Sequence, residues 1–482
     1  MAQTFPLFAL SLDRTSSVPL HRQLYEALRD LIQRRALPAG ADLPSTRALA
    51  QDLGIARNTV TAAYDQLTAE GYGVARPGAR TVVVDLPIRP LSAEETPPAQ
   101  RRPLSKRGEL MTRQPFHYGR PGGTAFHPGL PDAANFPFGL WGRLLTRRAQ
   151  HARDALFGTY HVEGYPDLRR AIANYLKVAR GVRCTPDQIL ITTGAQAGLD
   201  LLARLLLDPG DSVWMEEPGY YGAQSAFVAA GGTLAPLAVS EGVWDLTRPP
   251  ARRLKLIYVT PSCQHPLGAS MRMEQRLQLL EIAETLNAWI IEDDFDGEYR
   301  FQGQPIPAMQ GFDHDERVIY VGTFAKILFP ALRLGFIVLP PSLKNGIVNA
   351  LSLTGQFAPL MLQAALADFI EQGHMARHLR RMRRIYASRR QTFKDLVQSH
   401  LGDWLTMVPG DSGIQMAGLL RHPISDHTLV LAARERGINM SALSMHYRHG
   451  REKSGLVMGY AASNEAAMVQ GLETLRSLLP PG

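Results

Sequence analysis

Between residues 19 and 71, apolar side chains recur every three or four positions, which is the spacing of one face of an α-helix. In the first of three such stretches the apolar positions are Leu20, Leu24, Leu28 and Leu31. The second stretch follows Ser45, a residue type that caps helix N-termini, and stops at Gly54. The third stretch ends at Gly71, and its inward positions are Val60, Tyr64 and Leu67. The pattern predicts three helices.

After the third helix the pattern changes twice. The run ARPGARTVVVD predicts two short strands joined by a turn at Pro77 and Gly78. Residues 86–115 have no sustained apolar period and are rich in Pro, Arg and Glu, so we expect an extended linker there. The predicted organisation is therefore a small domain at 14–85, a linker at 86–115 and a large domain at 116–482.

The large domain alternates long helical stretches with short β-rich runs. These runs include QILITTG, DSVWMEEP, KLIYVTP, AWIIEDDF and RVIYVGTF. Strands that alternate with helices predict an α/β domain built around a mainly parallel sheet.

Length and composition agree with a multidomain globular protein. The chain has 482 residues, too many for one compact core. Its two cysteines, Cys184 and Cys263, cannot form a disulfide framework, which favours a reducing compartment. The start of the chain has no signal-peptide pattern, and the longest apolar stretch, residues 201–207, is too short to span a membrane. We expect a cytoplasmic protein without a membrane partner.

The net charge of +8 and the pI near 9.5 permit a polyanionic partner without requiring one. The densest basic run lies in HMARHLRRMRRIYASRRQ, far from the N-terminal helices. The solvated face of a long helix explains this run better than a nucleic-acid groove does. Charge alone therefore does not locate a DNA-binding surface.

Two short helices joined at residues 53–55, with another helix packed behind them, are what a helix-turn-helix requires. The candidate side chains on the face that reads bases are Arg57, Asn58 and Thr59. Arginine bonds guanine bidentately, and asparagine and threonine reach bases or phosphate. Arg47, Arg76 and Gly78 are candidates for contacts to the DNA backbone. The alternative is a small protein-interaction module in which Arg47 and Arg57 are ordinary surface charges.

A second constellation has the parts that pyridoxal 5'-phosphate needs, namely an imine-forming lysine, a phosphate cradle and an acid facing the pyridine nitrogen. In VGTFAKILFPALRLGF, Lys326 follows a predicted strand and is the imine lysine. The candidates for the phosphate are Arg333, Thr323 and the backbone N–H groups of Ala195 and Gln196. Asp293 would face the pyridine nitrogen, and Tyr220 would stack on the ring. Individually, each of these residues could also be an ordinary surface or strand-end residue.

The exact strings resemble known families. Residues 19–72 resemble the winged-helix domain of the GntR family of bacterial regulators, with Arg80 in the wing where the family has glycine. FHPGLPDAANFP, TTGAQAGLDLL, EEPGYYG, IIEDDFDGEY and GTFAKILFPALRLGF together resemble fold-type I aminotransferases. In this order the two halves resemble the MocR-type subfamily of GntR regulators.

The resemblance implies a winged helix-turn-helix (α+β) followed by an α/β fold-type I domain with a smaller C-terminal α+β subdomain. It implies a homodimer that binds double-stranded DNA operators with repeated half-sites. It also implies that pyridoxal 5'-phosphate is held on Lys326 as an internal aldimine, with Asp293 at the pyridine nitrogen. Tyr160 matches a position that reaches the phosphate across the dimer interface.

The chain departs from the aminotransferase pattern at positions that carry chemistry. Ala325 stands where a phosphate-binding serine is usual, and Phe295 where a tyrosine bonds the cofactor phenolate. His265 replaces an asparagine partner of the phenolate and is a substitute donor or simply a packed histidine. The arginine that clamps a substrate carboxylate aligns with Val457. Without that clamp, efficient transamination of α-amino acids is not expected.

Three hypotheses follow. The preferred one is a DNA-binding regulator, not an enzyme, that senses pyridoxal phosphate, a small amine effector, or both. The second is a working aminotransferase with a DNA-binding appendage, for which Arg448 or Arg451 would have to replace the missing clamp. The third is a regulator whose aminotransferase-like domain is only a dimerisation scaffold, which the retained Lys326, Asp293 and Arg333 argue against.

Overall fold

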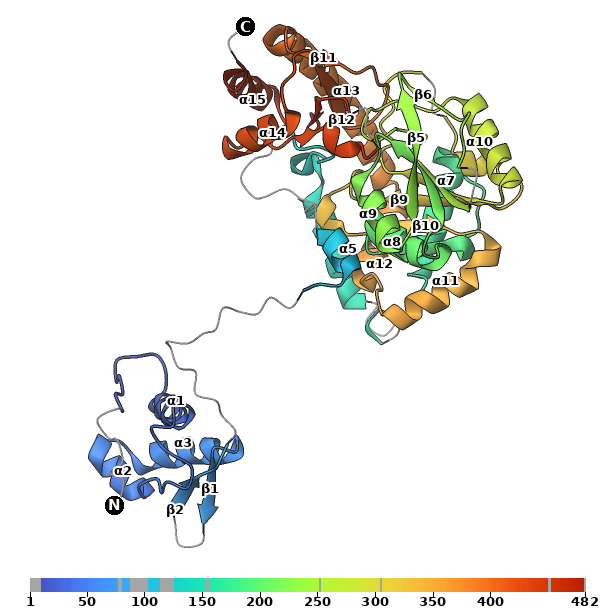
Figure 1. Ribbon diagram of the computed structural model, residues 1–482. Helices are drawn as coiled ribbons and strands as arrows, with labels where there is room; N and C mark the ends of the chain where they lie inside the picture. The colour runs from blue at the N-terminus through green and yellow to red at the C-terminus, as the bar shows by residue number, and fades with distance from the viewer. Residues whose placement is uncertain are drawn as a thin grey trace. The chain divides into compact units, whose positions relative to one another are not determined.

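The computed structural model describes residues 10–76, 80–86, 103–112, 125–151, 156–158, 160–250, 253–303, 306–449 and 452–480. The chain divides into two compact units, Met1–Pro103 and Leu104–Gly482. Figure 1 shows that each unit has its own set of packed helices and strands. No helix in the described ranges is both long and apolar enough to cross a membrane.

The N-terminal unit consists of three helices and a pair of strands. Its elements are α1 (Leu20–Gln33), α2 (Thr46–Leu53), α3 (Arg57–Ala69), β1 (Gly73–Arg76) and β2 (Arg80–Val83). The strands pair antiparallel, and the predicted turn between them lies outside the described residues. The predicted inward positions are buried, except that Leu20 is half-buried. The three predicted helices and both predicted strands are therefore present.

Local signals delimit α2. The hydroxyl of Ser45 accepts a hydrogen bond from the Ala48 N–H at 3.2 Å, which satisfies one of the free N–H groups of the first turn. Gly54 ends the helix with φ +61°, a left-handed conformation that favours glycine. Arg80 forms an ion pair with Asp42 at 3.1 Å and so joins the wing to the segment before α2. Arg80 therefore has an intramolecular role in this wing.

The C-terminal unit is built on an eight-stranded sheet in the order β3-β10-β9-β8-β7-β4-β5-β6. The strands are β3 (Ile189–Thr192), β4 (Ser212–Glu217), β5 (Thr233–Ser240), β6 (Val243–Trp244), β7 (Leu254–Val259), β8 (Trp289–Asp294), β9 (Val318–Thr323) and β10 (Gly335–Val338). β9, β8, β7, β4 and β5 run parallel, whereas β10 is antiparallel to both of its neighbours. The predicted mainly parallel α/β sheet is confirmed.

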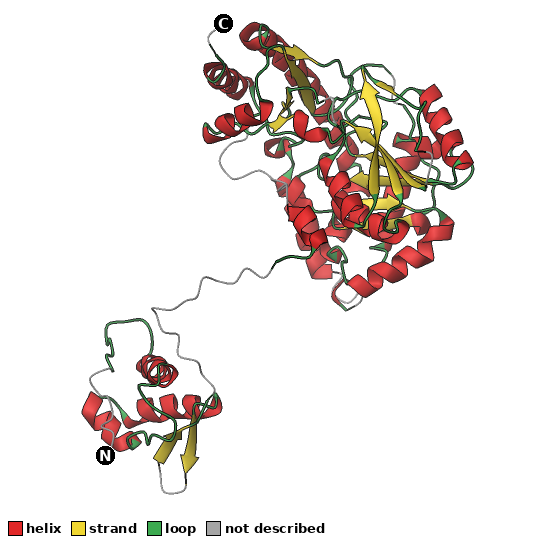
Figure 2. Ribbon diagram, in the orientation of Figure 1, coloured by secondary structure: helices red, strands yellow, loops and turns green. Residues whose placement is uncertain are grey.

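Helices cover both faces of this sheet (Figure 2). They are α5 (Phe138–His151), α7 (Pro166–Ala179), α8 (Ala195–Leu206), α9 (Tyr221–Ala229), α10 (Met273–Thr285), α11 (Pro341–Thr354) and α12 (Leu360–Glu371). Alternate residues of one strand belong to different cores: Ile189 and Ile191 pack in one hydrophobic cluster, and Leu190 packs in another. Because both faces are covered, the central strands β7 and β9 consist mostly of apolar residues.

A smaller subdomain follows the sheet. It contains α13 (His374–Leu401), β11 (Leu405–Met407), β12 (Gln415–Leu420), α14 (Asp426–Glu435), β13 (Ser441–Ala442), β14 (Gly455–Gly459) and α15 (Glu465–Ser477). Its four strands are antiparallel in the order β11-β12-β14-β13. Most arginines of the basic run on α13 are exposed, namely Arg377, Arg380, Arg381, Arg383 and Arg384. This matches the interpretation of the run as a solvated helix face.

The segment expected to be an extended linker contains the short helix α4 (Lys106–Thr112). This helix contacts α9 of the C-terminal unit. With only seven residues, α4 is too short to produce an apolar period in the sequence. The boundary between the two compact units falls just before it, between Pro103 and Leu104.

Replacing Leu67 by Ala should destabilise the N-terminal unit selectively. Leu67 is fully buried in that unit's core, so its truncation leaves a cavity that costs about 2–5 kcal/mol in the free energy of unfolding. Hydrogen–deuterium exchange of the full-length protein should show faster exchange in α1 and α3 and unchanged exchange in β8 and β9. Val74→Ala, at a position that is 47% exposed, is the control and should leave both units unchanged. Wild-type protection in Leu67→Ala would contradict the assignment of this core.

Candidate functional site

Lys326 lies three residues beyond the end of β9, and its amine is directed at the backbone. Nζ donates a hydrogen bond to the carbonyl oxygen of Gly129 at 2.6 Å. Gly129 has φ +65°, and a Cβ there would overlap Nζ, so only glycine suits this position. Burial lowers the pKa of the Lys326 amine, while Asp296 and Asp293 oppose that shift. The amine is thus more easily deprotonated than that of a surface lysine, as a nucleophile requires.

Asp293 lies near the C-terminal end of β8 and is 3% exposed. Its Oδ2 accepts a hydrogen bond from the Tyr258 hydroxyl at 2.7 Å. Its Oδ1 is buried and has no hydrogen-bond partner among the described residues. Burial raises the pKa of this carboxyl to about 7, whereas Tyr258 and Lys326 act to lower it. One buried acceptor atom is therefore available for a donor that the described part of the chain does not supply.

The predicted phosphate ligands converge at the N-terminus of α8. Gly335 of β10 pairs with Thr323 on one side and Thr192 on the other, and a Cβ on Gly335 would lie 2.8 Å from the Ala195 nitrogen. The Arg333 guanidinium lies 3.6 Å from the position of a Cβ on Gly194, the residue that precedes α8. A helix N-terminus with an arginine beside it is an anion-binding arrangement.

Two other predicted phosphate residues have intramolecular bonds. The Thr323 hydroxyl accepts a hydrogen bond from the Ala325 N–H at 3.2 Å. The Gln196 side chain donates from Nε2 to the Gly222 carbonyl at 2.8 Å. Thr323 thus orders the turn that leads to Lys326, and Gln196 joins α8 to α9.

Aromatic rings and histidines form the wall beside Lys326. The ring of His265 lies 5.3 Å from that of Tyr220, 5.5 Å from that of Phe295 and 5.1 Å from that of His446. Burial holds the pKa of His265 well below its usual value, with His446 and Lys326 adding to that shift. Burial also lowers the pKa of His446 to about 4. Both imidazoles are therefore neutral at physiological pH.

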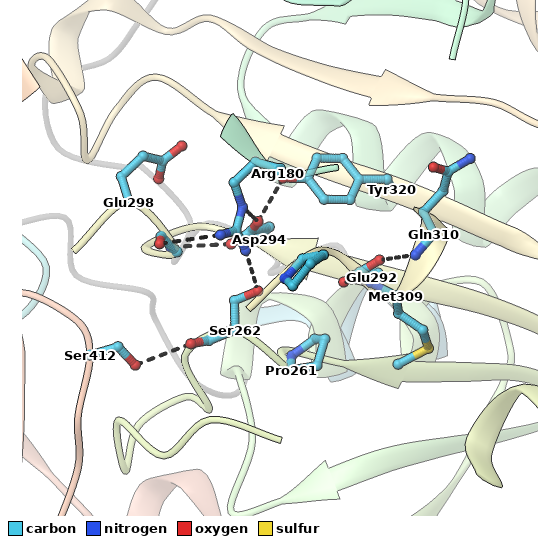
Figure 3. Close-up of polar contacts among 12 residues, drawn as sticks. Arg180, Pro261, Ser262, Glu292, Asp294, Glu298, Met309, Gln310, Tyr320 and Ser412 are labelled. Atoms are coloured by element: carbon cyan, nitrogen blue, oxygen red, sulfur yellow. Dashed lines mark hydrogen bonds and ion pairs between the residues drawn. The ribbon is translucent and has the colours of Figure 1, made fainter. Parts of the chain in front are cut away.

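The carboxylates on either side of Asp293 have partners of their own, which hold the strand end (Figure 3). Because side chains alternate along a strand, Glu292 and Asp294 lie on the opposite face of β8 from Asp293. Asp294 Oδ2 accepts bonds from Arg180 at 2.7 Å and from the Tyr320 hydroxyl at 2.6 Å. Glu292 accepts the backbone N–H groups of residues 309 and 310. This buried network fixes the strand end that carries Asp293.

Five residues of the site were not predicted: Gly129, Tyr258, Asp296, Gln415 and His446. Tyr258 and Asp296 lie in runs that the sequence analysis identified, KLIYVTP and IIEDDFDGEY, and strand alternation could have drawn attention to Tyr258. Gln415 and His446 come from the C-terminal subdomain, where no local pattern marks them. Only the tertiary fold brings Gln415 next to Gly129 and His446 next to His265.

Three residues that the sequence analysis singled out lie away from the lysine within this chain. Tyr160 is 82% exposed, and its nearest ring is that of Phe357 at 6.1 Å. Val457 is buried in a hydrophobic cluster on β14, opposite Ala417, so its position is apolar. Arg448 is exposed, and its backbone N–H bonds Glu217 at 3.3 Å. The other alternative, Arg451, lies outside the described residues.

In the N-terminal unit the candidate DNA contacts lie at helix starts and on the strands. Arg57 and Asn58, at the start of α3, are exposed, and Thr59 is half-buried. Arg57 Nε donates to the Thr46 hydroxyl at 3.2 Å, which links the first turns of α2 and α3. The exposed Arg47 and Arg76 lie on α2 and β1. Gly78 lies outside the described residues.

Comparisons with known proteins match both units. Residues 20–83 match the family described as bacterial regulatory proteins, gntR family, and residues 135–473 match aminotransferase class I and II. The chain is 50% identical over 472 residues to the Probable rhizopine catabolism regulatory protein MocR of Rhizobium meliloti, covering 97% of this chain and 95% of the relative. It is 31% identical over 463 residues to the HTH-type pyridoxine biosynthesis transcriptional regulator PdxR of Corynebacterium glutamicum, covering 95% of each.

Solved structures agree with the fold. Kynurenine aminotransferase of Pyrococcus horikoshii superposes with a TM-score of 0.69 at 23% identity, over 80% of this chain and 96% of that one. The α-aminoadipate aminotransferase LysN of Thermus thermophilus superposes with a TM-score of 0.68 at 26% identity, over 74% and 92%. These neighbours show that the C-terminal unit has the fold of pyridoxal-phosphate-dependent aminotransferases.

The fold and the two matches define a class of protein, a transcription regulator in which a helix-turn-helix domain precedes an aminotransferase-like domain. More specifically, the chain belongs to the MocR-type subfamily of GntR-family regulators. The predicted family and fold class are confirmed.

Asp296→Asn should lower the pKa of the Lys326 amine further. Asp296 contributes the larger of the two carboxylate effects that favour the ammonium form, so its neutralisation makes deprotonation easier. Acetylation of Lys326 in cofactor-free full-length protein, followed by mass spectrometry across pH, should show a midpoint at lower pH than in wild type. Asp411→Asn removes a carboxylate paired with Arg300 instead and should leave the midpoint unchanged. A midpoint that stays or rises in Asp296→Asn would contradict this electrostatic assignment.

Proposed function

We propose that this regulator holds pyridoxal 5'-phosphate covalently on Lys326 and responds to the cofactor and to a small amine. The observation that carries the proposal is the buried Oδ1 of Asp293, which has no partner among the described residues, in the same site as the amine of Lys326. A protonated pyridine nitrogen is a donor of the kind that this atom needs. Both residues belong to this chain, and the fold alone brings them together.

The remaining residues fit the other parts of the cofactor. The N-terminus of α8, at Ala195, and the Arg333 guanidinium suit a phosphate dianion. Gln415 Nε2 lies 3.5 Å from His265 Nδ1, so a neutral His265 that accepts there carries its proton on Nε2. That proton gives His265 a donor for the phenolate, a role that Phe295 cannot fill. When bound, pyridoxal phosphate supplies an aldehyde and an electron-withdrawing ring.

We further propose that the protein acts as a homodimer on double-stranded DNA with repeated half-sites. Large apolar side chains of the C-terminal unit are exposed, namely Phe157 at 64%, Tyr160 at 82% and Leu353 at 88%. Such exposure in three places supports a surface that a second copy covers. Tyr160 would then contribute to the partner's cofactor site, as the family resemblance implies. A ligand that favours one of two dimer arrangements would alter how the helix-turn-helix units span DNA.

Aminotransferase activity is the second candidate, and the class I and II match of residues 135–473 favours it. Turnover would need Lys326 to move protons at the substrate carbon and a cation to orient the substrate carboxylate. The apolar surroundings of Val457 do not provide that cation. We therefore propose that multiple turnovers with ordinary α-amino acids do not occur.

Arg57→Ala should weaken binding to the operator while leaving the cofactor site intact. A bidentate arginine–guanine contact discriminates by roughly 1–3 kcal/mol, so the Kd should rise by about fivefold to 150-fold. Fluorescence anisotropy with the protein's own upstream DNA, at fixed moderate salt, measures this change. Arg34→Ala removes an exposed arginine paired with Asp30 on α1 and serves as the control. An unchanged Kd for Arg57→Ala would remove Arg57 from the DNA-reading face.

Lys326→Ala should abolish the absorbance of lysine-bound pyridoxal phosphate while the cofactor-free protein still binds DNA. The reason is that the buried amine of Lys326 bonds the Gly129 carbonyl and lies close enough to Asp293 for its charge to lower the pKa of that carboxyl. Absorbance spectroscopy and borohydride trapping followed by mass spectrometry measure the attachment. A trapped lysine adduct in Lys326→Ala would show that another lysine is the attachment point. DNA binding that is indifferent to cofactor in wild type would favour the scaffold hypothesis.

A further inference from the structure

Two buried polar side chains, Asp296 and Gln415, lie beside Lys326, and a third, His446, lies beside His265. They form what we call the acceptor pocket, consisting of Asp296, Gln415 and His446. Each is less than 9% exposed. Burying polar atoms without partners costs free energy, so atoms left unsatisfied in such a place indicate a ligand that satisfies them.

Asp296 supplies the strongest acceptor. Its side chain is fully buried, and its Oδ2 accepts the backbone N–H of Ile414 at 3.1 Å. Its Oδ1 has no hydrogen-bond partner in the part of the chain that the structure describes. The charge of Lys326 is the largest influence that keeps this carboxyl ionised, which places Asp296 beside the reactive amine.

His446 supplies a second acceptor, and its tautomer follows from its one bond. Nδ1 lies 3.2 Å from the Gly219 carbonyl oxygen, which can only accept, so Nδ1 carries the proton. Nε2 is therefore a bare lone pair, and it is buried without a partner among the described residues. The ring lies 5.1 Å from that of His265, on the Tyr220 side of the site.

Gln415 links these atoms to the lysine. Its Oε1 lies 3.5 Å from the position of a Cβ on Gly129, the residue whose carbonyl holds Lys326 Nζ. Its Nε2 lies 3.5 Å from His265 Nδ1, at the far limit of a hydrogen bond. Gln415 can therefore both accept from and donate to a group placed next to the amine.

We infer that the acceptor pocket selects a primary amine that carries a hydroxyl group and no carboxylate. This inference rests on the proposed function, in which an amine reaches the cofactor at Lys326. A hydroxyl donates to Asp296 Oδ1 or His446 Nε2 and accepts from Gln415. A carboxylate placed next to Lys326 would instead meet the unpartnered acceptor Asp296 Oδ1, and Val457 is apolar and supplies no cation to compensate its charge.

A hydroxyl fits the acceptor pocket better than a second ammonium group does. Burial raises the pKa of Asp296 to about 7, so its charge is easily lost and is a weak basis for binding a cation. His446 is neutral, because its pKa lies near 4. A polar but uncharged group therefore matches the pocket without bringing an uncompensated charge into it.

The test is a titration of the full-length protein carrying pyridoxal phosphate with four amines that each contain three carbon atoms. The probes are 3-amino-1-propanol, propylamine, 1,3-diaminopropane and β-alanine, and the change in cofactor absorbance gives each apparent Kd. We expect 3-amino-1-propanol to bind up to about tenfold more tightly than propylamine, the upper end of what one net hydrogen bond contributes. We expect β-alanine to bind at least tenfold more weakly than 3-amino-1-propanol. Equal Kd values for 3-amino-1-propanol and propylamine, or tighter binding of the diamine or β-alanine, would overturn the inference.

The variant Asp296→Asn tests whether the preference for the hydroxyl-bearing amine arises in the acceptor pocket. The preference for 3-amino-1-propanol over propylamine, measured on the cofactor-loaded fraction of each protein, should fall towards one. Because both amines react at the same Lys326, a changed lysine pKa cancels from this ratio. Asp411→Asn, whose carboxylate pairs with Arg300, should keep the wild-type ratio. If wild type shows no lysine-bound absorbance at all, the proposed function fails. If the absorbance is present and the amines bind alike, only the acceptor pocket fails.

Discussion

The C-terminal unit depends on one electrostatic constraint, the burial of the Lys326 amine beside the carboxyls of Asp293 and Asp296. Burial disfavours the charged form of all three groups, lowering the pKa of the lysine and raising those of both carboxyls to about 7. Each charge makes the opposite charge tolerable, so loss of one member leaves an uncompensated buried charge. The Lys326 amine and the two carboxyls therefore form one coupled electrostatic group.

This group of charges requires a rigid end of strand β8. Strand β8 provides one because its side chains alternate between the two faces of the sheet. Glu292 and Asp294 are buried on the face opposite Asp293, and each has its own set of donors. Glu292 lies 3.8 Å from Arg276 and accepts two backbone N–H groups, while Asp294 bonds Arg180 and Tyr320. Three consecutive acidic residues can end a fully buried strand only because these partners satisfy two of them. The third keeps an oxygen available for the site.

The sequence allowed prediction of what depends on local pattern. The inward faces of α1 and α3, the cap at Ser45 and the five β-rich runs depend on spacing, and all are present in the structure. Asp293 and Lys326 could be selected from the sequence because they lie at or just after the ends of predicted strands. In contrast, His446 meets His265 only because the C-terminal subdomain folds back onto the sheet, and no local period connects two residues so far apart in the chain. Helix α4 was not predicted because its seven residues are too few to show a helical pattern of apolar positions.

Relative to the aminotransferase pattern, the positions that suit the cofactor are retained, and the position that would bind a substrate carboxylate is substituted. Lys326, Asp293 and Arg333 suit the cofactor and are retained, whereas the position that would orient a carboxylate substrate is the buried Val457. An enzyme needs both sets, because turnover requires a substrate that is held and oriented. A sensor needs only occupancy, since a ligand shifts an equilibrium by its differential affinity for two states, whether or not it reacts further. If the protein is the amine sensor proposed above, the acceptors beside Lys326 bear on which amine it recognises.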